Sequence, residues 1–191
     1  MTLTGTFTAL VTPFNTDGSV DYPALRDLVN WQIENGVTGL VPVGTTGEAP
    51  TLDFAEHAQV IEAVAEAAAG KSVIIAGTGA NSTAEAIDLT RDVLNAGVDA
   101  TLQVTPYYNK PNAEGLYRHF MSVAELGLPV VLYNVPGRTS KEIPLDVVVR
   151  LAAHPNIVAI KEAAGSVDRV SAIRNACDLP VLSGDDGLAL P

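Results

Sequence analysis

The sequence predicts an α/β fold, and two patterns along the chain support this prediction. Seven short apolar runs recur, and most do not alternate with polar residues, which is typical of parallel strands covered on both faces. Helical stretches separate the runs at roughly the 24–33-residue spacing of βαβ units. The predicted strands cover residues 7–12, 39–43, 72–76, 100–104, 130–133, 157–160 and 181–183.

The stretches between the runs have the composition and the end signals of helices. The clearest covers residues 51–69 and is rich in Ala and Glu. Asp53 is suited to be its N-cap, Glu56 completes a capping box three residues later, and Gly70 provides the stop. The other predicted helices cover residues 22–34, 82–96, 112–126, 145–153 and 167–176.

A doubly wound sheet and a (β/α)₈ TIM barrel both fit this order of elements. Polar or Gly-rich segments follow nearly every predicted strand, which favours the barrel because a barrel gathers its strand ends around one site. A complete barrel typically has about 250 residues, and the seventh predicted strand ends close to residue 191. We therefore expect residues 1–191 to form a single barrel domain truncated after about seven strands, either as a fragment or as an open barrel that needs a partner.

Composition and charge restrict the classes of partner and the location. Acidic residues number 22 and basic residues 11, and the resulting net charge of −11 argues against nucleic acid and against a polybasic membrane surface. An anionic substrate stays open, because local charges govern a site. No signal peptide is apparent and no apolar run reaches the roughly 18 residues of a membrane span, so a cytoplasmic location is expected.

Metal and disulfide chemistry are not expected. Cys177 is the only cysteine, which excludes an intrachain disulfide and a Cys-rich zinc site. The three histidines, His57, His119 and His154, are scattered and lack the spacing of metal ligands.

Two side chains at the ends of neighbouring predicted strands suggest carbonyl chemistry. Lys161 follows the run 157–160, and Tyr133 ends the run 130–133. At a barrel mouth, burial would lower the pKa of Lys161 from its usual value of about 10.4 and leave a neutral amine to attack a carbonyl. A phenol beside this amine could move protons for a Schiff-base reaction. The alternatives are a solvated strand terminus for Lys161 and a core aromatic residue for Tyr133.

Three loop residues are candidates to bind carboxylates. Thr45 and Thr46 lie in a short Gly-flanked loop, where hydroxyl and backbone N–H groups could hold an anion or simply complete a tight turn. Arg138 follows Pro136-Gly137 and could fork onto a carboxylate, although most loop arginines are solvated.

Three further positions are candidates to contact a partner or a ligand. Tyr107 and Tyr108 put two large aromatic side chains on a loop, where their exposure is costly without a partner surface. Gly184 follows the seventh strand, where it is either a turn residue or a place where the backbone approaches a ligand closely.

Four motifs in order resemble the dihydrodipicolinate synthase (4-hydroxy-tetrahydrodipicolinate synthase) family of class I aldolase-type (β/α)₈ enzymes. The resemblance covers the whole chain. The motifs are GTTGE at 44–48, TPYYNKP at 105–111, YNVPGRT at 133–139 and IKEA at 160–163.

The resemblance implies a Schiff base between Lys161 and pyruvate, with Tyr133 as general acid and base. It further implies that Thr45 and Tyr108 complete a proton relay with Tyr133. Thr46 would hold the pyruvate carboxylate. The product would enter lysine and diaminopimelate biosynthesis, and no metal or organic cofactor is implied.

Two further implications concern the second substrate and the assembly. Arg138 would receive the carboxylate of L-aspartate 4-semialdehyde. The family suggests a homotetramer built as a dimer of dimers, in which Tyr108 or its neighbour Tyr107 is inserted from an adjoining subunit; Tyr108 is favoured for the relay and Tyr107 for the interface.

The resemblance also implies that lysine binds between paired subunits as an inhibitor. Among the matching positions, Asn81, Glu85 and Tyr107 keep polar chemistry that suits an ammonium and a carboxylate, whereas Ala49 and Phe54 depart from it. Asn81 and Glu85 could equally serve only the start of their helix. The full set of positions is Ala49, Pro50, Phe54, His57, Asn81, Glu85 and Tyr107.

Two alternatives to the synthase stay open. One is another pyruvate aldolase of the family, either N-acetylneuraminate lyase or a keto-deoxy sugar acid aldolase. The lyase usually has Ser where Thr45 stands and lacks both the paired tyrosines and an Arg at position 138. The other alternative is a non-catalytic fragment, because an unclosed sheet leaves strand edges unpaired.

Overall fold

The computed structural model describes residues 3–189, which divide into two compact units. Among these residues, the N-terminal unit comprises 3–78 and Leu89–Thr101, and the C-terminal unit comprises Gly79–Asp88 and 102–189. Helix α3 (Thr83–Asp92) and strand β4 (Ala100–Val104) contribute residues to both units. The prediction of one barrel domain over 1–191 stays a prediction.

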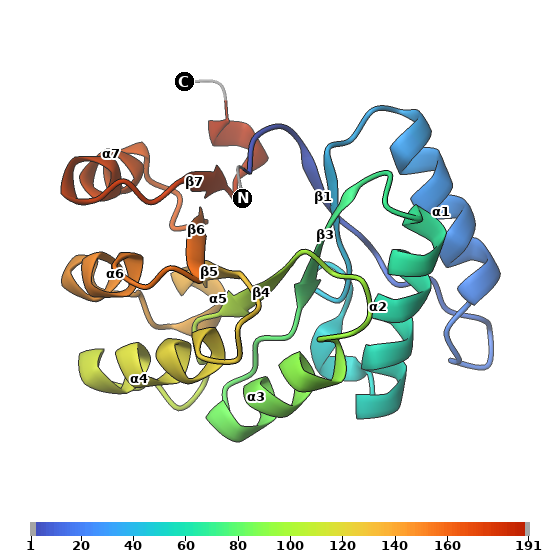
Figure 1. The fold of residues 1–191 in the computed structure, drawn as a ribbon, viewed down its shortest axis with the longest axis horizontal. Helices are drawn as coiled ribbons and strands as arrows, with labels where there is room; N and C mark the ends of the chain where they lie inside the picture. The colour runs from blue at the N-terminus through green and yellow to red at the C-terminus, as the bar shows by residue number, and fades with distance from the viewer. Residues whose placement is uncertain (1–2, 190–191) are drawn as a thin grey trace. The chain divides into compact units, whose positions relative to one another are not determined.

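The N-terminal unit contains three parallel strands in chain order. These are β1 (Phe7–Ala9), β2 (Gly39–Val41) and β3 (Val73–Gly77), with β2 paired to both neighbours. Its helices are α1 (Tyr22–Glu34), the short 3₁₀ turn η1 (Ala49–Thr51) and α2 (Phe54–Ala68). Helices α1 and α2 pack against each other and lie side by side in Figure 1.

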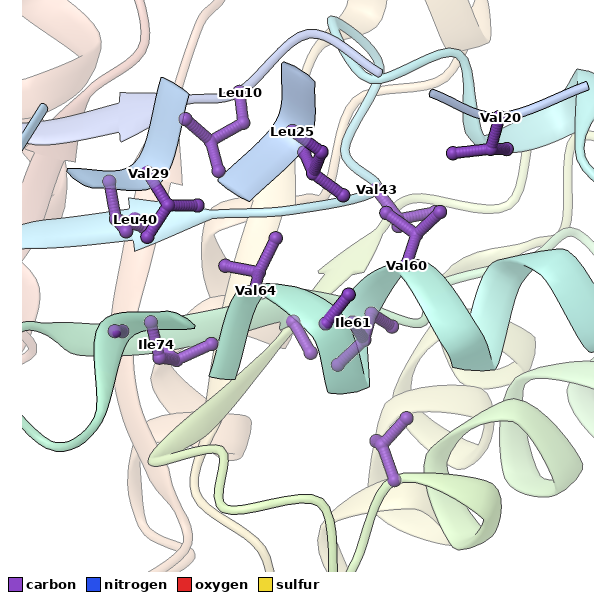
Figure 2. Close-up of a cluster of buried hydrophobic side chains, with 14 residues drawn as sticks. Leu10, Val20, Leu25, Val29, Leu40, Val43, Val60, Ile61, Val64 and Ile74 are labelled. Carbon is purple, nitrogen blue, oxygen red and sulfur yellow. The ribbon is translucent and has the colours of Figure 1, made fainter. Parts of the chain in front are cut away.

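A cluster of branched aliphatic side chains forms the core of this unit (Figure 2). Helix α1 contributes Leu25 and Val29, and α2 contributes Val60 and Val64; all four are buried. These pairs are four residues apart, so each helix presents one apolar stripe to the interior. Figure 2 also labels Leu10, Val20, Leu40, Val43, Ile61 and Ile74 in the same cluster.

The C-terminal unit repeats the alternation of strand and helix. Strands β5 (Val130–Asn134), β6 (Ile157–Glu162) and β7 (Val181–Ser183) pair in parallel, with β6 in the middle. Helix α6 packs against both α4 and α7. The helices are α4 (Ala113–Ala124), the four-residue α5 (Pro136–Thr139), α6 (Leu145–Ala152), α7 (Val167–Ala176) and the 3₁₀ turn η2 (Asp186–Leu188).

The structure confirms the predicted alternation, and each predicted run and helical stretch contains an element of the expected type. The capping box is also confirmed: Glu56 N–H donates to the Asp53 carboxylate at 2.8 Å, and Asp53 N–H donates to the Glu56 carboxylate at 3.2 Å. The stop of α2 differs by one residue, because the left-handed conformation begins at Ala69 (φ 48°) and continues at Gly70 (φ 73°).

Some strands end earlier than predicted and others end later. Strands β1 and β2 end earlier than predicted, and β2 is followed by Pro42, which has no N–H to donate, and by Val43 in the left-handed region (φ 52°). Strands β5 and β6 end later, at Asn134 and Glu162. Within residues 3–189, no helix is long and apolar enough to cross a membrane.

Candidate active site

The ends of β5 and β6 bring Lys161 and Tyr133 together. The two residues are register partners in the parallel ladder, so their side chains extend from the same face of adjacent strands. Lys161 Nζ lies 4.6 Å from the centroid of the Tyr133 ring, and Tyr133 is buried. Thr105 holds the Tyr133 backbone, because its N–H and its hydroxyl both donate to the Tyr133 carbonyl at 2.9 Å.

Burial and one acidic side chain set the electrostatics of the amine. Burial lowers the pKa of Lys161, and the Asp186 carboxylate opposes this shift. A lowered pKa increases the fraction of neutral amine, which is the nucleophilic form. The geometry and the charge state therefore both suit addition of the amine to a carbonyl carbon.

Gly184 borders the same amine. A Cβ at this position would lie 3.1 Å from Lys161 Cε, 2.7 Å from Ala163 Cβ and 3.2 Å from the Glu162 carbonyl oxygen. Real Cβ atoms almost never approach another carbon to 2.7 Å, so the site excludes a side chain here. The missing side chain is what leaves room for the Lys161 stem.

A buried polar network lies next to this pair, and sequence reasoning missed it. Glu162 is 4% exposed, and the Asn134 amide donates to its two carboxylate oxygens at 2.8 and 3.0 Å. Arg169 Nε lies 3.6 Å from Glu162 and 3.1 Å from Glu142. Burial raises the pKa of Glu162, while Asn134 and Arg169 oppose the rise.

The available sequence signal for this network was weak. Glu162 and Asn134 each follow a residue with a proposed role, and both stand where an apolar run gives way to polar residues. Nothing in one-dimensional spacing indicated that the two would be register partners on neighbouring strands.

Three of the positions predicted to bind lysine gather within the C-terminal unit. Burial raises the pKa of Tyr107, the Glu85 carboxylate adds to this rise, and a backbone hydrogen bond at Asn81 opposes it. The Asn109 amide donates to the Asn81 carbonyl at 2.9 Å and ties the tyrosine loop to the segment before α3. Tyr108, which follows Tyr107, is 90% exposed and has φ 71°, in the left-handed region.

The other residues predicted to bind lysine lie in the N-terminal unit. His57 is buried within α2, and burial lowers its pKa to about 4. Phe54 begins α2 and is 60% exposed, while Ala49 and Pro50 lie in η1. The structure does not test whether these residues bind lysine, so the site stays a prediction.

Thr45 and Thr46 are exposed in a constrained loop of the N-terminal unit. The loop follows Val43, and the Thr12 hydroxyl donates to the Gly47 carbonyl at 2.7 Å. A β-branched residue at positive φ is strained, which is typical of segments whose backbone geometry is tightly specified. This supports a loop that is held in place, and the roles of the two hydroxyls stay predictions.

Arg138 lies in the short helix α5, immediately after β5. Its side chain is exposed. The predicted rigid turn is a single helical turn that begins at Pro136, with Ser140 N–H donating to the Pro136 carbonyl at 2.9 Å.

Comparison with known proteins decides the family. A model of the dihydrodipicolinate synthetase family matches residues 2–191. The chain belongs to the dihydrodipicolinate synthetase family. It is 54% identical over 192 residues to a 4-hydroxy-tetrahydrodipicolinate synthase of Neisseria meningitidis, a match that covers 99% of this chain and 66% of that relative.

Solved structures of dihydrodipicolinate synthases share the fold. The synthase of Acinetobacter baumannii complexed with pyruvate has a TM-score of 0.92 and 52% identity, covering 97% of this chain and 65% of that one. The synthase of Cyanidioschyzon merolae with lysine bound has a TM-score of 0.94 and 44% identity, covering 98% and 63%. The likeness confirms the predicted barrel class, with seven strands within residues 3–189. The chain spans just under two thirds of the length of these relatives.

Proposed function

We propose that this chain is the pyruvate-binding part of a 4-hydroxy-tetrahydrodipicolinate synthase, which condenses pyruvate with L-aspartate 4-semialdehyde in lysine and diaminopimelate biosynthesis. The observation that carries the proposal is the half-buried Lys161 beside Tyr133 at the ends of β5 and β6. The family match and the relative complexed with pyruvate support the choice of substrate. The proposal includes a cytoplasmic location.

In the proposed reaction, the neutral Lys161 amine attacks the carbonyl carbon of pyruvate. The adduct loses water to give an iminium, and the Tyr133 hydroxyl supplies the proton that the departing oxygen needs. The iminium then draws electrons from the neighbouring C–H bond, and loss of that proton gives an enamine. The enamine carbon forms the new bond to the aldehyde carbon of the semialdehyde.

The remaining roles come from the family resemblance and are part of the proposal. Thr45 and Tyr108 serve the proton relay, and Thr46 holds the pyruvate carboxylate. Arg138 receives the carboxylate of the semialdehyde, which its exposed guanidinium allows. Gly184 lets its backbone lie close to the reacting amine.

Rates with two aldehydes test this function against the other pyruvate aldolases. Pyruvate consumption is measured with L-aspartate 4-semialdehyde and, separately, with a sugar aldehyde. The proposal expects turnover with the semialdehyde, and expects Arg138→Ala to raise its KM more than the KM for pyruvate. Arg174→Ala, an exposed arginine at the end of α7, is the matched control. Preference for the sugar aldehyde would favour a sugar acid aldolase, and no turnover with either would identify an inactive fragment.

We also propose that the protein binds lysine and assembles as a homotetramer. The gathering of Asn81, Glu85 and Tyr107 supports a ligand that carries an ammonium, and the relative solved with lysine supports its identity. The 90% exposure of Tyr108 supports a partner surface on its loop. Lysine titration by calorimetry, with and without Glu85→Gln, and sedimentation equilibrium test the two claims separately.

A further inference from the structure

Several hydrogen-bond donors surround the carboxylate of Glu162. The Asn134 amide donates to both oxygens, and Ala164 N–H donates to Oε1 at 2.9 Å. Arg169 Nε approaches Oε2 at 3.6 Å. Buried charges of this kind often add little net stability compared with a well-packed apolar side chain, and in some proteins they specify one arrangement of the chain.

Both the nitrogen and the oxygen of the Asn134 side-chain amide form hydrogen bonds. Its oxygen accepts from Ile143 N–H at 3.0 Å, so its nitrogen must face Glu162. The Asn134 carbonyl accepts from Ala163 N–H at 2.9 Å, which continues the strand pairing past Glu162. The amide therefore has one orientation, and that orientation fixes β5 against β6.

The hydrogen bonds between Asn134 and Glu162 lie one residue beyond Tyr133 and Lys161 along the two strands. Tyr133 is the register partner of Lys161, and Asn134 is the register partner of Glu162. Successive side chains of a strand point to opposite faces, so Lys161 and Tyr133 share one face while Asn134 and Glu162 share the other. A slip or splay of the strands at the polar pair would displace the amine from the phenol.

We propose that Glu162 is a positioning residue that holds Lys161 in register with Tyr133 through its hydrogen bonds to Asn134. The proposal rests on the function proposed above. Glu162 acts through geometry, because its carboxylate is engaged by Asn134 and Ala164 N–H and lies near Arg169, on the face opposite to Lys161. Because a misplacement of about 1 Å can cost roughly 10²-fold in rate, small movements at this pair have large effects.

A swap of the two side-chain types tests the proposal. In Glu162→Gln, the new amide group presents a donor to Asn134, Ala164 or Arg169, each of which is itself a donor. In Asn134→Asp, two carboxylates face each other in a buried place. In the double variant, the new amide on β6 donates to the new carboxylate on β5, and that carboxylate still accepts from Ile143 N–H. The oxygen of the new amide still accepts from Ala164 N–H. The donors and acceptors of positions 134 and 162 are therefore matched again only in the double variant, in which Arg169 keeps its ion pair with Glu142.

Two rates at Lys161 are measured in the full chain by peptide mass spectrometry. The first is imine formation with pyruvate, trapped by borohydride, and the second is trace acetylation by acetic anhydride, relative to Lys71 and Lys110. We expect each single variant to slow imine formation by roughly 10- to 100-fold and to change the acetylation rate of Lys161, because the surroundings of the amine shift, and we expect the double variant to recover both rates to within about threefold of the parent. Equal rates in all variants, or an equal loss in the double variant, would overturn the proposal.

The two readouts separate this proposal from the proposed function. If the parent chain forms no imine but the acetylation rates follow the expected pattern, the function fails and the positioning role stands. If the parent forms the imine and the single variants match it, the positioning role fails alone. Should a single variant not fold, Glu162→Asp replaces it, since it keeps the charge but withdraws the carboxylate by one methylene. It must also slow imine formation and change the acetylation rate.

Discussion

Replacing Gly184 by alanine tests whether the space around Lys161 is as tight as the structure indicates. The added Cβ would lie 2.7 Å from Ala163 Cβ and 3.1 Å from Lys161 Cε. Carbon atoms pack best at about 3.5–4.0 Å, so Ala163 must retreat by about 1 Å and Lys161 by about 0.5 Å. The lysine stem can bend, but Ala163 Cβ is fixed to the backbone directly after β6. The end of β6 must therefore move.

Two effects of different size follow from this movement. Overpacking costs about 1–3 kcal/mol of stability. Displacement of the amine by up to about 1 Å slows its reaction by up to roughly 10²-fold. We expect Gly184→Ala to slow borohydride-trapped imine formation with pyruvate by roughly 10- to 100-fold, measured at a temperature where the variant stays folded.

Gly187→Ala is the matched control for this experiment. A Cβ at Gly187 meets no described atom within 4 Å, and the residue lies in the exposed turn η2 only three positions away. Its trapping rate should equal that of the parent chain. An unchanged rate in Gly184→Ala, with unchanged unfolding, would refute the inference that Gly184 keeps space open for Lys161.

Three further predictions follow from the charges and protons of the structure. Asp186→Asn removes the carboxylate that opposes the lowered pKa of Lys161, so the pH dependence of imine formation should move to lower pH. A shift to higher pH would contradict the inference that Asp186 raises the pKa of Lys161. Tyr133→Phe keeps the ring but removes the hydroxyl, so turnover should fall by roughly 10²–10⁴-fold while pyruvate binding, followed by calorimetry, changes little; an unchanged rate would exclude Tyr133 as the acid and base. Burial lowers the pKa of His119 to about 4, below the value of 6.5 for an exposed histidine, so between these values the unfolded chain binds the extra proton and stability falls as the pH falls. Urea unfolding at pH 7.5 and 5.0 should show a loss of about 2 kcal/mol from this residue, and His119→Leu should remove that part of the loss.

Much of the fold could be predicted from local patterns. The apolar runs located every strand, because strands covered on both faces require continuous Val, Ile and Leu. The capping box of α2 could be read directly, since Asp53 and Glu56 satisfy each other's backbone groups within one turn. These features depend only on neighbours in sequence.

The ends of the strands could not be predicted in the same way. Hydrophobic runs stop at Tyr133 and Ile160, but β5 and β6 continue to Asn134 and Glu162. The reason is tertiary, since a carboxylate on one strand accepts hydrogen bonds from an amide on the next. A pattern based on hydrophobicity cannot predict a strand end that is stabilised by polar partners 28 residues apart in the sequence.

In the candidate site, too, some features could be predicted from the sequence and others depend on tertiary contacts. Strand position alone left Lys161 open to the ordinary interpretation of a solvated terminus. The family resemblance supplied the catalytic roles, and the structure supplied the 4.6 Å approach of Nζ to the Tyr133 ring and the lowered pKa of the amine. The contributions of Gly184 and Asp186 depend on contacts across β6 and β7, which spacing along the chain does not reveal.

The most direct test of the account is to identify the lysine that reacts with pyruvate. The chain is incubated with pyruvate, reduced with borohydride, digested, and mapped by mass spectrometry. We predict a carboxyethyl group on Lys161 and none on Lys71, Lys110 or Lys141, with the modification lost in Lys161→Arg. Modification at another lysine, or none at saturating pyruvate, would contradict the claim that Lys161 is the Schiff-base residue.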